Sequence, residues 1–356
     1  MEKSDIVIAA DKIFRILPAG ELRDLSLMER VIPCDGLCAF PGLIDQHAHI
    51  LGGGGEQGFS SRVQELNAGE FFAAGVTTAV GLLGADGYTR SMECLYAKAK
   101  ALEADGMTTY LYSGSYTLPV SVLTGSLTRD LLFVDKVIGA GEIAISDHRS
   151  SQPDLKELMK LGADAHLGGL LAGKAGVVHL HVGDGAQGLD LLFELVQKSD
   201  LPLGQFVPTH MNRSPFLFRQ AVKYCRLGGN IDLTAGETAG IPVPRAIAVL
   251  LKEGVSLSNV TVSSDAGGSI PAGGVSGVQA LYEDLRACIM QSVLAPREAI
   301  RLASEHVARI LKLYPAKGAI APGSDADILI TDQDYRLQML VCMGKILVEN
   351  GCPVGQ

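Results

Sequence analysis

The chain has 356 residues, of which 47% are hydrophobic and 19% charged, so it can build a large buried core and global disorder is excluded. Its formal net charge of −9 argues against a nucleic-acid partner, because phosphate binding needs a basic surface. No apolar run of about 18 residues is present, so we expect no membrane span. The seven cysteines are scattered without a CxxC pair and the first residues lack a signal-peptide core, which favours reduced thiols and a cytoplasmic location.

The first 40 residues predict short strands and no long helix. Alternating apolar residues mark strands at 6–9 and 12–17. The last 40 residues repeat this style at 327–331 and 343–348. We therefore predict that residues 1–40 and 317–356 pair into one small β-sandwich, while residues 41–316 form a separate domain.

The middle of the chain alternates short apolar strands with helical stretches. Strands are predicted at 76–83, 107–112, 142–146, 177–182, 206–209, 231–234 and 260–264. Helices are predicted at 61–74, from Ser91 to Gly106, from Ser151–Pro153 to a stop at Gly162, at 189–196, and from Ser214–Pro215 to Gly228. About eight βα units over roughly 270 residues favour a closed (β/α)8 TIM-like barrel, with a doubly wound open sheet as the alternative.

The sharpest chemical signal is the His-x-His pair formed by His47 and His49. Residues i and i+2 of a strand point to the same side, so the two imidazoles aim at one point. That point lies at the carboxyl end of the first barrel strand, where barrel active sites are found.

Four further candidates lie on later strands. His181, His210 and Asp265 end predicted strands, and Glu142 opens the strand that leads to Ser146-Asp147-His148-Arg149. Four histidines and two carboxylates suit two borderline divalent ions such as Zn²⁺, and a carboxylate can bridge two metals. His179 shares the strand face of His181 and is a rival ligand.

Two other chemistries are excluded by the motifs. The glycine-rich stretch 52–58 is followed by no Gly-Lys-Ser/Thr, so it is not a phosphate loop. Ser263 and Ser264 lack the GxSxG elbow of a serine hydrolase.

Nine stretches give the chain a resemblance to a known family. They are PGLIDQHAH (41–49), LGGGGEQG (51–58), AGVTTAVGLLG (74–84), ISDHRSSQPD (145–154), GGLLAGKAG (168–176), HVGD (181–184), PTHMNR (208–213), SSDAGGS (263–269) and APGSDADILI (321–330). The chain resembles the amidohydrolase superfamily and, within it, the isoaspartyl dipeptidase branch. The resemblance implies a metal-dependent hydrolase that cleaves the isopeptide bond of β-aspartyl dipeptides, is a homo-oligomer and binds neither nucleic acid nor membrane.

The resemblance also implies roles for individual residues. His47, His49 and Asp265 would hold one metal, His181 and His210 the other, and a hydroxide would bridge the two ions. Asp265 would accept the hydroxide proton and pass it to the leaving amine, while Tyr116 would stabilise the oxyanion. The remaining residues would bind substrate: Glu56 the α-ammonium, Arg149, Arg213 and Ser269 the two carboxylates, and backbone groups near Gly54 the substrate at close range.

The sequence departs from the family pattern in two places. The family bridges its metals with a carbamylated lysine, but residues 137–145 contain none. Glu142 falls at the matching place after one extra residue and already carries a carboxylate, so we expect it to be the bridge; Lys174 lies outside this strand. The alternative is a solvated loop glutamate and one metal fewer. Ala85 also replaces a hydroxyl residue that touches substrate, and the loop after Ser269 is short.

Two rival functions remain open. One is another amidohydrolase that acts on a cyclic amide or an N-acyl amino acid, since the fold does not fix the substrate. The other is a non-catalytic binder that retains the pocket but has lost turnover with the lysine bridge.

Overall fold

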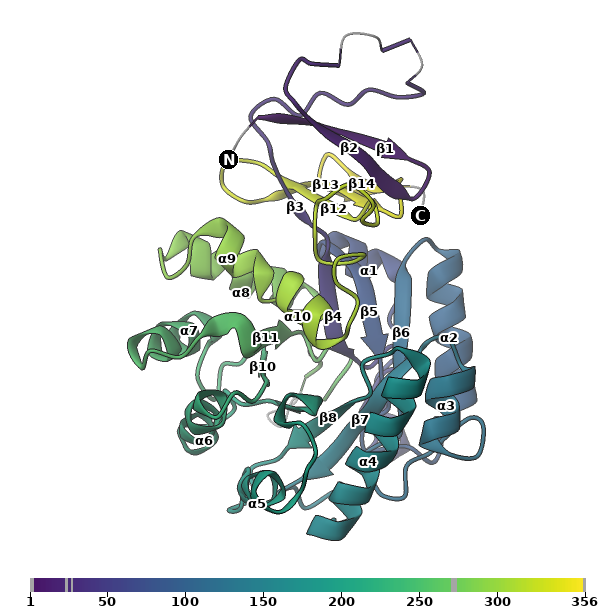
Figure 1. Cartoon of the computed structure of the whole chain (residues 1–356), viewed down its shortest axis with the longest axis vertical. Helices are drawn as coiled ribbons and strands as arrows, with labels where there is room; N and C mark the ends of the chain where they lie inside the picture. Colours follow the sequence, from purple (N-terminus) through teal and green to yellow (C-terminus); the bar gives the residue numbers. More distant parts are fainter. Residues whose placement is uncertain (1–2, 23–24, 27, 270–273, 355–356) are drawn as a thin grey trace.

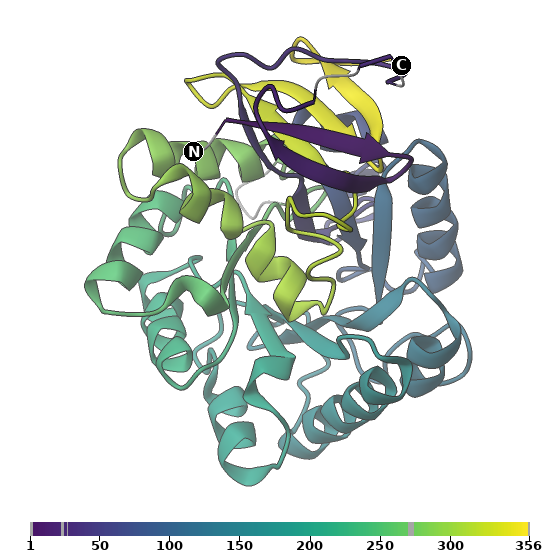
Figure 2. The ribbon, with the colours of Figure 1, turned by 45° about the horizontal axis from the view of Figure 1, so that its top comes forward.

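A computed structural model describes residues 3–22, 25–26, 28–269 and 274–354 in two parts. The larger part is a ring of parallel strands with helices outside it, and a smaller β-rich part made from both chain ends lies against one side of the ring (Figures 1 and 2). The predicted barrel with an added β-sandwich is therefore confirmed. The domain limits at residues 40/41 and 316/317 stay a prediction.

Eight parallel strands form the barrel wall. They are β4 (Leu43–Ala48), β5 (Val76–Gly81), β6 (Thr108–Ser113), β7 (Val137–Ile145), β8 (Val177–Val182), β9 (Phe206–Thr209), β10 (Ile231–Thr234) and β11 (Val260–Ser263). Strands β4 to β9 pair in sequence order, and β10 pairs with β11. A parallel bridge between Ala48 and Ala266 joins the two edges, and the backbone N–H of Met211 donates to Asp232 O to join β9 to β10.

Helices cover the outside of the barrel, and several begin where the sequence places a capping residue. They are α1 (Ala68–Ala73), α2 (Met92–Ala104), α3 (Leu127–Phe133), α4 (Leu155–Ala172), α5 (Asp190–Lys198), α6 (Pro215–Arg226), α7 (Val243–Lys252), α8 (Gln279–Met290), α9 (Pro296–Arg301) and α10 (Glu305–Ile310). Ser91 and Ser214 accept from backbone N–H groups at the starts of α2 and α6, as predicted. Short 3-10 turns lie at Phe59–Ser61, Leu203–Gln205 and Leu257–Asn259.

The smaller part is built from a hairpin and a five-stranded sheet. The hairpin pairs β1 (Ser4–Ala9) with β2 (Lys12–Pro18). The sheet has the order β15 (Cys352–Pro353), β14 (Lys345–Glu349), β13 (Leu337–Cys342), β12 (Ile328–Thr331) and β3 (Cys38–Pro41). A small apolar cluster around Ile13, Ile328 and Val341 lies between them. Strand β3 runs directly into β4, so this part is anchored to the first barrel strand.

Two predicted helices differ from the structure. Residues 62–67 are not helical, because Asn67 forms a capping box with Glu70 and starts α1 at Ala68. Helix α4 continues through Gly162, because this glycine is a close contact with Leu201 rather than a stop.

Two further differences from the prediction concern strands. Glu142 lies inside β7, which begins at Val137, and does not open it. Strand β13 was not predicted at all, although it pairs with both β12 and β14.

Among the described residues, no helix has both the length and the apolar character needed to cross a membrane. All seven cysteines lie in the described part of the chain and are free thiols, as expected.

Candidate active site

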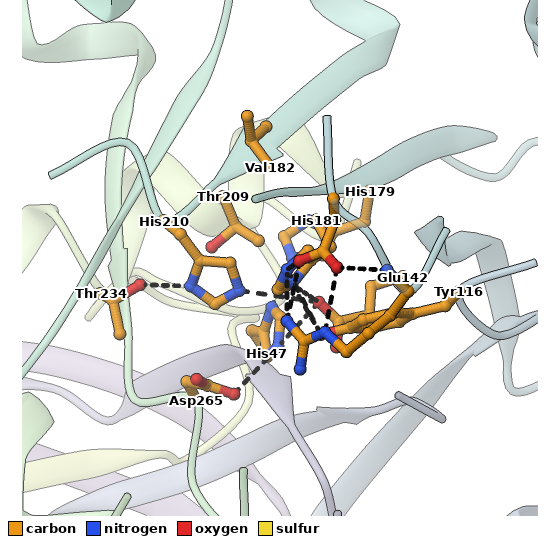
Figure 3. Close-up of polar contacts among 12 residues, drawn as sticks. His47, Tyr116, Glu142, His179, His181, Val182, Thr209, His210, Thr234 and Asp265 are labelled. Atoms are coloured by element: carbon orange, nitrogen blue, oxygen red, sulfur yellow. Dashed lines mark hydrogen bonds and ion pairs between the residues drawn. The ribbon is translucent and has the colours of Figure 1, made fainter. Parts of the chain in front are cut away.

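The six predicted metal ligands meet at the carboxyl ends of the barrel strands. His47 and Glu142 lie on β4 and β7, and His181 lies on β8. His49, His210 and Asp265 follow directly after β4, β9 and β11. Figure 3 shows the side chains of His47, His181, His210, Glu142 and Asp265 converging from different strands. This is the end of a parallel barrel at which active sites lie.

Glu142 is at the centre of the cluster. Its Oε2 lies 3.5 Å from His47 Nε2, 3.2 Å from His181 Nδ1 and 3.7 Å from His210 Nε2. Its Oε1 lies 3.4 Å from His49 Nε2. A single fully buried carboxylate therefore faces all four histidines. His47 and His49 lie in one half of the site, and His181 and His210 lie in the other.

A bulge in β7 brings Glu142 to this position. Ala140 pairs with Val178 and Ile143 with Leu180, so β7 contains one more residue than β8 over the same stretch. Gly141 lies in the bulge, where an added Cβ would approach His179 Cβ to 2.9 Å. The extra residue noted in the sequence thus lies in this bulge, and glycine is needed beside it because the neighbouring strand is close.

Asp265 closes the half of the site that contains the His-x-His pair. Its Oδ1 lies 3.3 Å from His47 Nε2 and 3.1 Å from His49 Nε2. Both Asp265 and His210 have positive φ angles, 52° and 62°, which are uncommon for residues other than glycine. Such backbone strain is concentrated at functional sites, where the surrounding structure imposes it.

Burial and opposite charge set the protonation of the cluster. Burial alone would lower the pKa of His47, but Glu142 and Asp265 outweigh it and raise the pKa to about 9. Burial would likewise raise the pKa of Glu142, yet His47 and His181 hold it well below its usual range. Burial, together with the charge of Arg213, lowers the pKa of His210 to about 3. The carboxylates are thus anionic and His210 is neutral, the forms that bind metal, whereas an ion bound by His47 has to displace the proton that the raised pKa favours there.

The donor set is of the kind that binds divalent metal. Two groups of three have ligand atoms within 4.8 Å of one another: His47, His49 and Glu142, and Glu142, His181 and His210. Glu142 belongs to both groups. Within the described part of the chain, His47 Nε2 and Glu142 Oε1 are among the few buried polar atoms without a hydrogen-bond partner. Buried polar atoms left in this way need an explanation, and a bound cation supplies one here.

Several of the histidines are oriented by a second set of residues. His210 Nδ1 is 2.7 Å from Thr234 Oγ1, and His47 Nδ1 is 2.8 Å from His179 Nε2. His179 therefore contacts a candidate ligand and belongs to neither group of three. His181 Nε2 is 3.0 Å from Asp147 Oδ2. Contacts of this kind fix the ring orientation of metal-binding histidines.

A buried carboxylate supports the floor of the site. Asp232, on β10, accepts hydrogen bonds from Thr209 Oγ1 at 2.7 Å, from Ser263 Oγ at 2.5 Å and from the side-chain amide of Gln46 at 2.7 Å. Four barrel strands, β4, β9, β10 and β11, are thereby tied together directly below the candidate ligands. Asp232 and Thr234 lie in no motif, so no pattern in the sequence points to either of them.

The predicted substrate residues surround the open side of the cluster. Arg149 Nη1 donates to Glu56 Oε1 at 3.1 Å, and Ser269 Oγ donates to the same oxygen at 3.2 Å. Arg213 Nη1 donates to Val182 O at 3.2 Å and lies 3.4 Å from His181 Nε2. The pattern therefore brings one acidic and several basic or hydroxyl groups to one place.

The other predicted residues occupy more varied positions. Tyr116 OH lies 2.8 Å from His181 Nδ1, close to the metal-ligand candidates. Gly54 has a φ of 71° and no room for a side chain, since a Cβ would approach Ser61 O to 2.5 Å. Ala85 is half-buried. The short loop after Ser269 begins with residues 270–273, which lie outside the described residues.

The basic group of Arg149 is held in place from behind. Arg149 Nε and Nη2 donate to the two oxygens of Asp147 at 3.0 and 2.8 Å, and this hydrogen bonding raises the arginine's pKa. Asp147 thus connects the substrate-side arginine with His181. Lys174 donates instead to Val134 O, which agrees with its exclusion as a metal bridge.

The chain matches a known protein family and a solved structure over most of its length. The profile of the amidohydrolase family matches residues 38–347. The chain belongs to the amidohydrolase family. It is 40% identical to the β-aspartyl dipeptidase of Fervidobacterium islandicum AW-1, whose crystal structure superposes with a TM-score of 0.92 over 99% of this chain and 95% of that one. A second structure of that protein, in complex with β-Asp-Leu, has a TM-score of 0.91 and covers 100% and 95% of the two chains.

A shorter similarity links the chain to another member of the family. A segment of 59 residues is 39% identical to D-hydantoinase of Streptomyces coelicolor, and this segment spans 17% of our chain and 13% of that protein. The resemblance to amidohydrolases and to their isoaspartyl (β-aspartyl) dipeptidase branch is therefore confirmed.

Proposed function

We propose that this amidohydrolase cleaves the isopeptide bond of β-aspartyl dipeptides. The observation that carries the proposal is one buried carboxylate facing four histidines beside a cluster of Glu56, Arg149 and Arg213. A β-aspartyl dipeptide presents a free α-ammonium, a free α-carboxylate and the carboxylate of its second residue. The similarity over almost the full length to a β-aspartyl dipeptidase supports this substrate class.

Two divalent ions fit the donor set. We propose that His47, His49 and Asp265 would hold one ion, that His181 and His210 would hold the other, and that Glu142 would be their shared ligand. Bound there, such ions supply a water of lowered pKa and polarise a carbonyl group. We take zinc as the native ion because imidazole and carboxylate ligands suit it.

Glu142 replaces the carbamylated lysine that bridges the metals in the family pattern. Its carboxylate needs no carbon dioxide to form. The glutamate side chain is shorter than a carbamylated lysine, and the bulge in β7 compensates by placing the backbone of residue 142 next to the histidines. The site is therefore independent of bicarbonate.

Asp265 is the general base and then the general acid of the proposed reaction. Its carboxylate is held anionic despite burial, because the neighbouring rings of His47 and His49 lower its pKa. It accepts a proton from the attacking water and delivers it to the nitrogen of the leaving amine. Tyr116 donates its O–H to the oxygen of the scissile carbonyl, since burial keeps its pKa well above 10 and the hydroxyl protonated.

The charged groups at the open side select the substrate. Glu56 pairs with the α-ammonium, and Arg149, Arg213 and Ser269 bind the carboxylates, for which the guanidinium fork is suited. Glu56 is bonded to Arg149 and Ser269 in the free protein. These contacts keep the pocket ordered before the substrate binds. On binding, the charges of the substrate replace them.

The proposal also covers the domain limits, the location, the oligomeric state and the partners of the protein. The barrel domain spans residues 41–316 and carries the site, and residues 1–40 and 317–356 form the sandwich domain. The enzyme is a cytoplasmic homo-oligomer whose partner is the small dipeptide alone. The acidic balance of the chain, 39 acidic against 30 basic residues, speaks against nucleic acid.

The test is a comparison of isomeric substrates. Zinc-loaded enzyme is assayed with β-Asp-Leu, α-Asp-Leu, N-acetyl-leucine and a hydantoin, the last because of the segment shared with D-hydantoinase. We expect turnover of β-Asp-Leu alone. Turnover of hydantoin or N-acetyl-leucine in its place assigns a different amide substrate. No turnover with two bound metals keeps a hydrolase but rejects these substrates, whereas no bound metal supports a non-catalytic binder.

Two variants test the substrate contacts in the same assay. Glu56→Gln and Arg213→Met each remove one charge, and a hydrogen bond to a charged group is worth about 1.5–3 kcal/mol, so kcat/KM should fall by roughly tenfold or more. Arg226→Met is the control, because Arg226 pairs with Glu253 away from the site. A change within about threefold for both site variants contradicts the proposed substrate.

A further inference from the structure

Arg90 is a buried cation that neither the sequence motifs nor the proposed mechanism uses. It lies in the segment after β5, and only 5% of the residue is exposed. A buried guanidinium is costly unless its donors are satisfied. Its one carboxylate partner is Asp86 Oδ2, at 3.0 Å from Nη1.

The other N–H groups of Arg90 donate to backbone carbonyls of residues 51–54 and of Val63. Nε donates to Leu51 O at 3.3 Å, Nη2 to Gly53 O at 2.7 Å and Nη1 to Gly54 O at 3.4 Å. Nη2 also donates to Val63 O at 3.3 Å. One side chain thus holds three carbonyls of the glycine loop, residues 51–55.

Backbone hydrogen bonds already join the glycine loop to residues 61–63, from Gly55 N to Ser61 O at 3.2 Å and from Val63 N to Gly53 O at 3.0 Å, and Arg90 adds side-chain contacts to these. Its Gly52, Gly54 and Gly55 have φ angles of 70°, 71° and 102°, and glycine gains the most conformational freedom when it is released. The backbone still passes closely against neighbours, since a Cβ on Gly52 would approach Val63 O to 2.2 Å. Side-chain packing therefore cannot fix the loop, and hydrogen bonds must do so.

The glycine loop joins the two halves of the proposed site. It follows the candidate ligand His49 directly, and Gly52 N donates to His49 O at 2.7 Å. Glu56, the proposed partner of the α-ammonium, comes immediately after it. Gly53 N also donates to Gly267 O at 2.8 Å, two residues beyond Asp265.

We propose that Arg90 is a positioning residue that sets the place of Glu56 and so determines the preference for substrates with a free α-amine. The inference rests on the proposed function. Arg90 does not touch the substrate in this proposal. It determines, through Glu56, how well the enzyme distinguishes β-aspartyl dipeptides from analogues without the amine. Loosening the glycine loop moves Glu56, while the metal ligands on the strands keep their places.

The experiment compares β-Asp-Leu with N-succinyl-leucine, which lacks only the α-amine. The ratio of the two kcat/KM values, and of the two dissociation constants from calorimetry, is measured for wild type, Arg90→Met and Arg90→Lys. Lys136→Met is the matched control, because Lys136 is an equally buried cation that donates to Thr109 O and Glu103 instead. Metal content is measured in each sample.

We expect Arg90→Met to lower the preference for β-Asp-Leu by roughly tenfold, through KM, with two metals still bound. Arg90→Lys keeps the charge but cannot span the carbonyls, so it should recover only part of the preference. Lys136→Met should leave the ratio unchanged even if it is less stable.

Two results would overturn the inference in different ways. An unchanged ratio in Arg90→Met, with both rates lowered together, makes Arg90 merely structural and leaves the proposed function standing. A wild-type enzyme that neither cleaves nor prefers β-Asp-Leu removes the proposed function and the inference with it.

Discussion

Replacing Glu142 by glutamine tests the metal bridge while preserving the shape of the side chain. The rise of the His47 pKa from 6.5 to about 9 corresponds to about 3 kcal/mol of net stabilisation of one positive charge at that ring. Glu142 Oε2 and Asp265 Oδ1 lie at similar distances from His47 Nε2, 3.5 and 3.3 Å. Burial opposes this rise, so the carboxylates together contribute more than the net effect, and half of the net effect, about 1.5 kcal/mol, is a lower bound for Glu142.

A divalent ion carries twice the charge, so the loss of the carboxylate should weaken metal binding by at least about 3 kcal/mol, on the order of a hundredfold. Competition with a chromophoric chelator measures the affinity, and elemental analysis gives the number of ions retained. Glu103→Gln is the control, since Glu103 pairs with Lys100 and Lys136 away from the site. A Glu142→Gln protein that retains two ions with wild-type affinity refutes the bridge and the reasoning from the His47 pKa.

Three further predictions address the contacts around the site and the core. Asp147→Asn should weaken metal binding by about tenfold to a hundredfold in the same chelator assay, because Asp147 orients His181; an unchanged affinity makes the contact incidental. Gly162→Val should lower the free energy of unfolding by about 2 kcal/mol in denaturant titrations, since even a Cβ would approach Leu201 Cδ1 to 2.7 Å; no loss means that the packing relaxes freely. Burial lowers the pKa of His306, so the unfolded chain binds a proton that the folded chain does not, and stability should fall as pH drops below 6.5; His306→Gln should flatten this slope in unfolding measured between pH 5 and 7, and an unchanged slope assigns it to other groups.

The barrel could be predicted because each strand is a short apolar run closed by a turn signal. Strand β9 (Phe206–Thr209) and β10 (Ile231–Thr234) match their predicted ranges. The start of β7 was missed because Gly139 and Gly141 weaken the strand pattern, although an added Cβ at Gly139 would approach Val177 O to 2.5 Å. Glycine is required at residue 139 because β8 passes close to it, and no local sequence pattern reveals this contact.

The candidate ligands could be predicted for a different reason. Parallel barrel strands end at one rim, so the topology alone brings His47, His181 and His210 close to one another. The residues that orient them were out of reach. Thr234 contacts His210, and Arg90 contacts the glycine loop, across sequence separations that carry no periodic signal. Such contacts depend on the folded positions of loops, and sequence patterns describe these least well.

Stepwise metal reconstitution is the measurement that tests the central claim most directly. Metal-free enzyme is titrated with zinc in buffer stripped of bicarbonate, and hydrolysis of β-Asp-Leu is followed against the number of ions bound. We predict that activity rises to its maximum at two ions per chain and that added bicarbonate changes nothing, because Glu142 supplies the bridging carboxylate. Maximal activity at one ion, or activity that appears only with bicarbonate, would contradict the account.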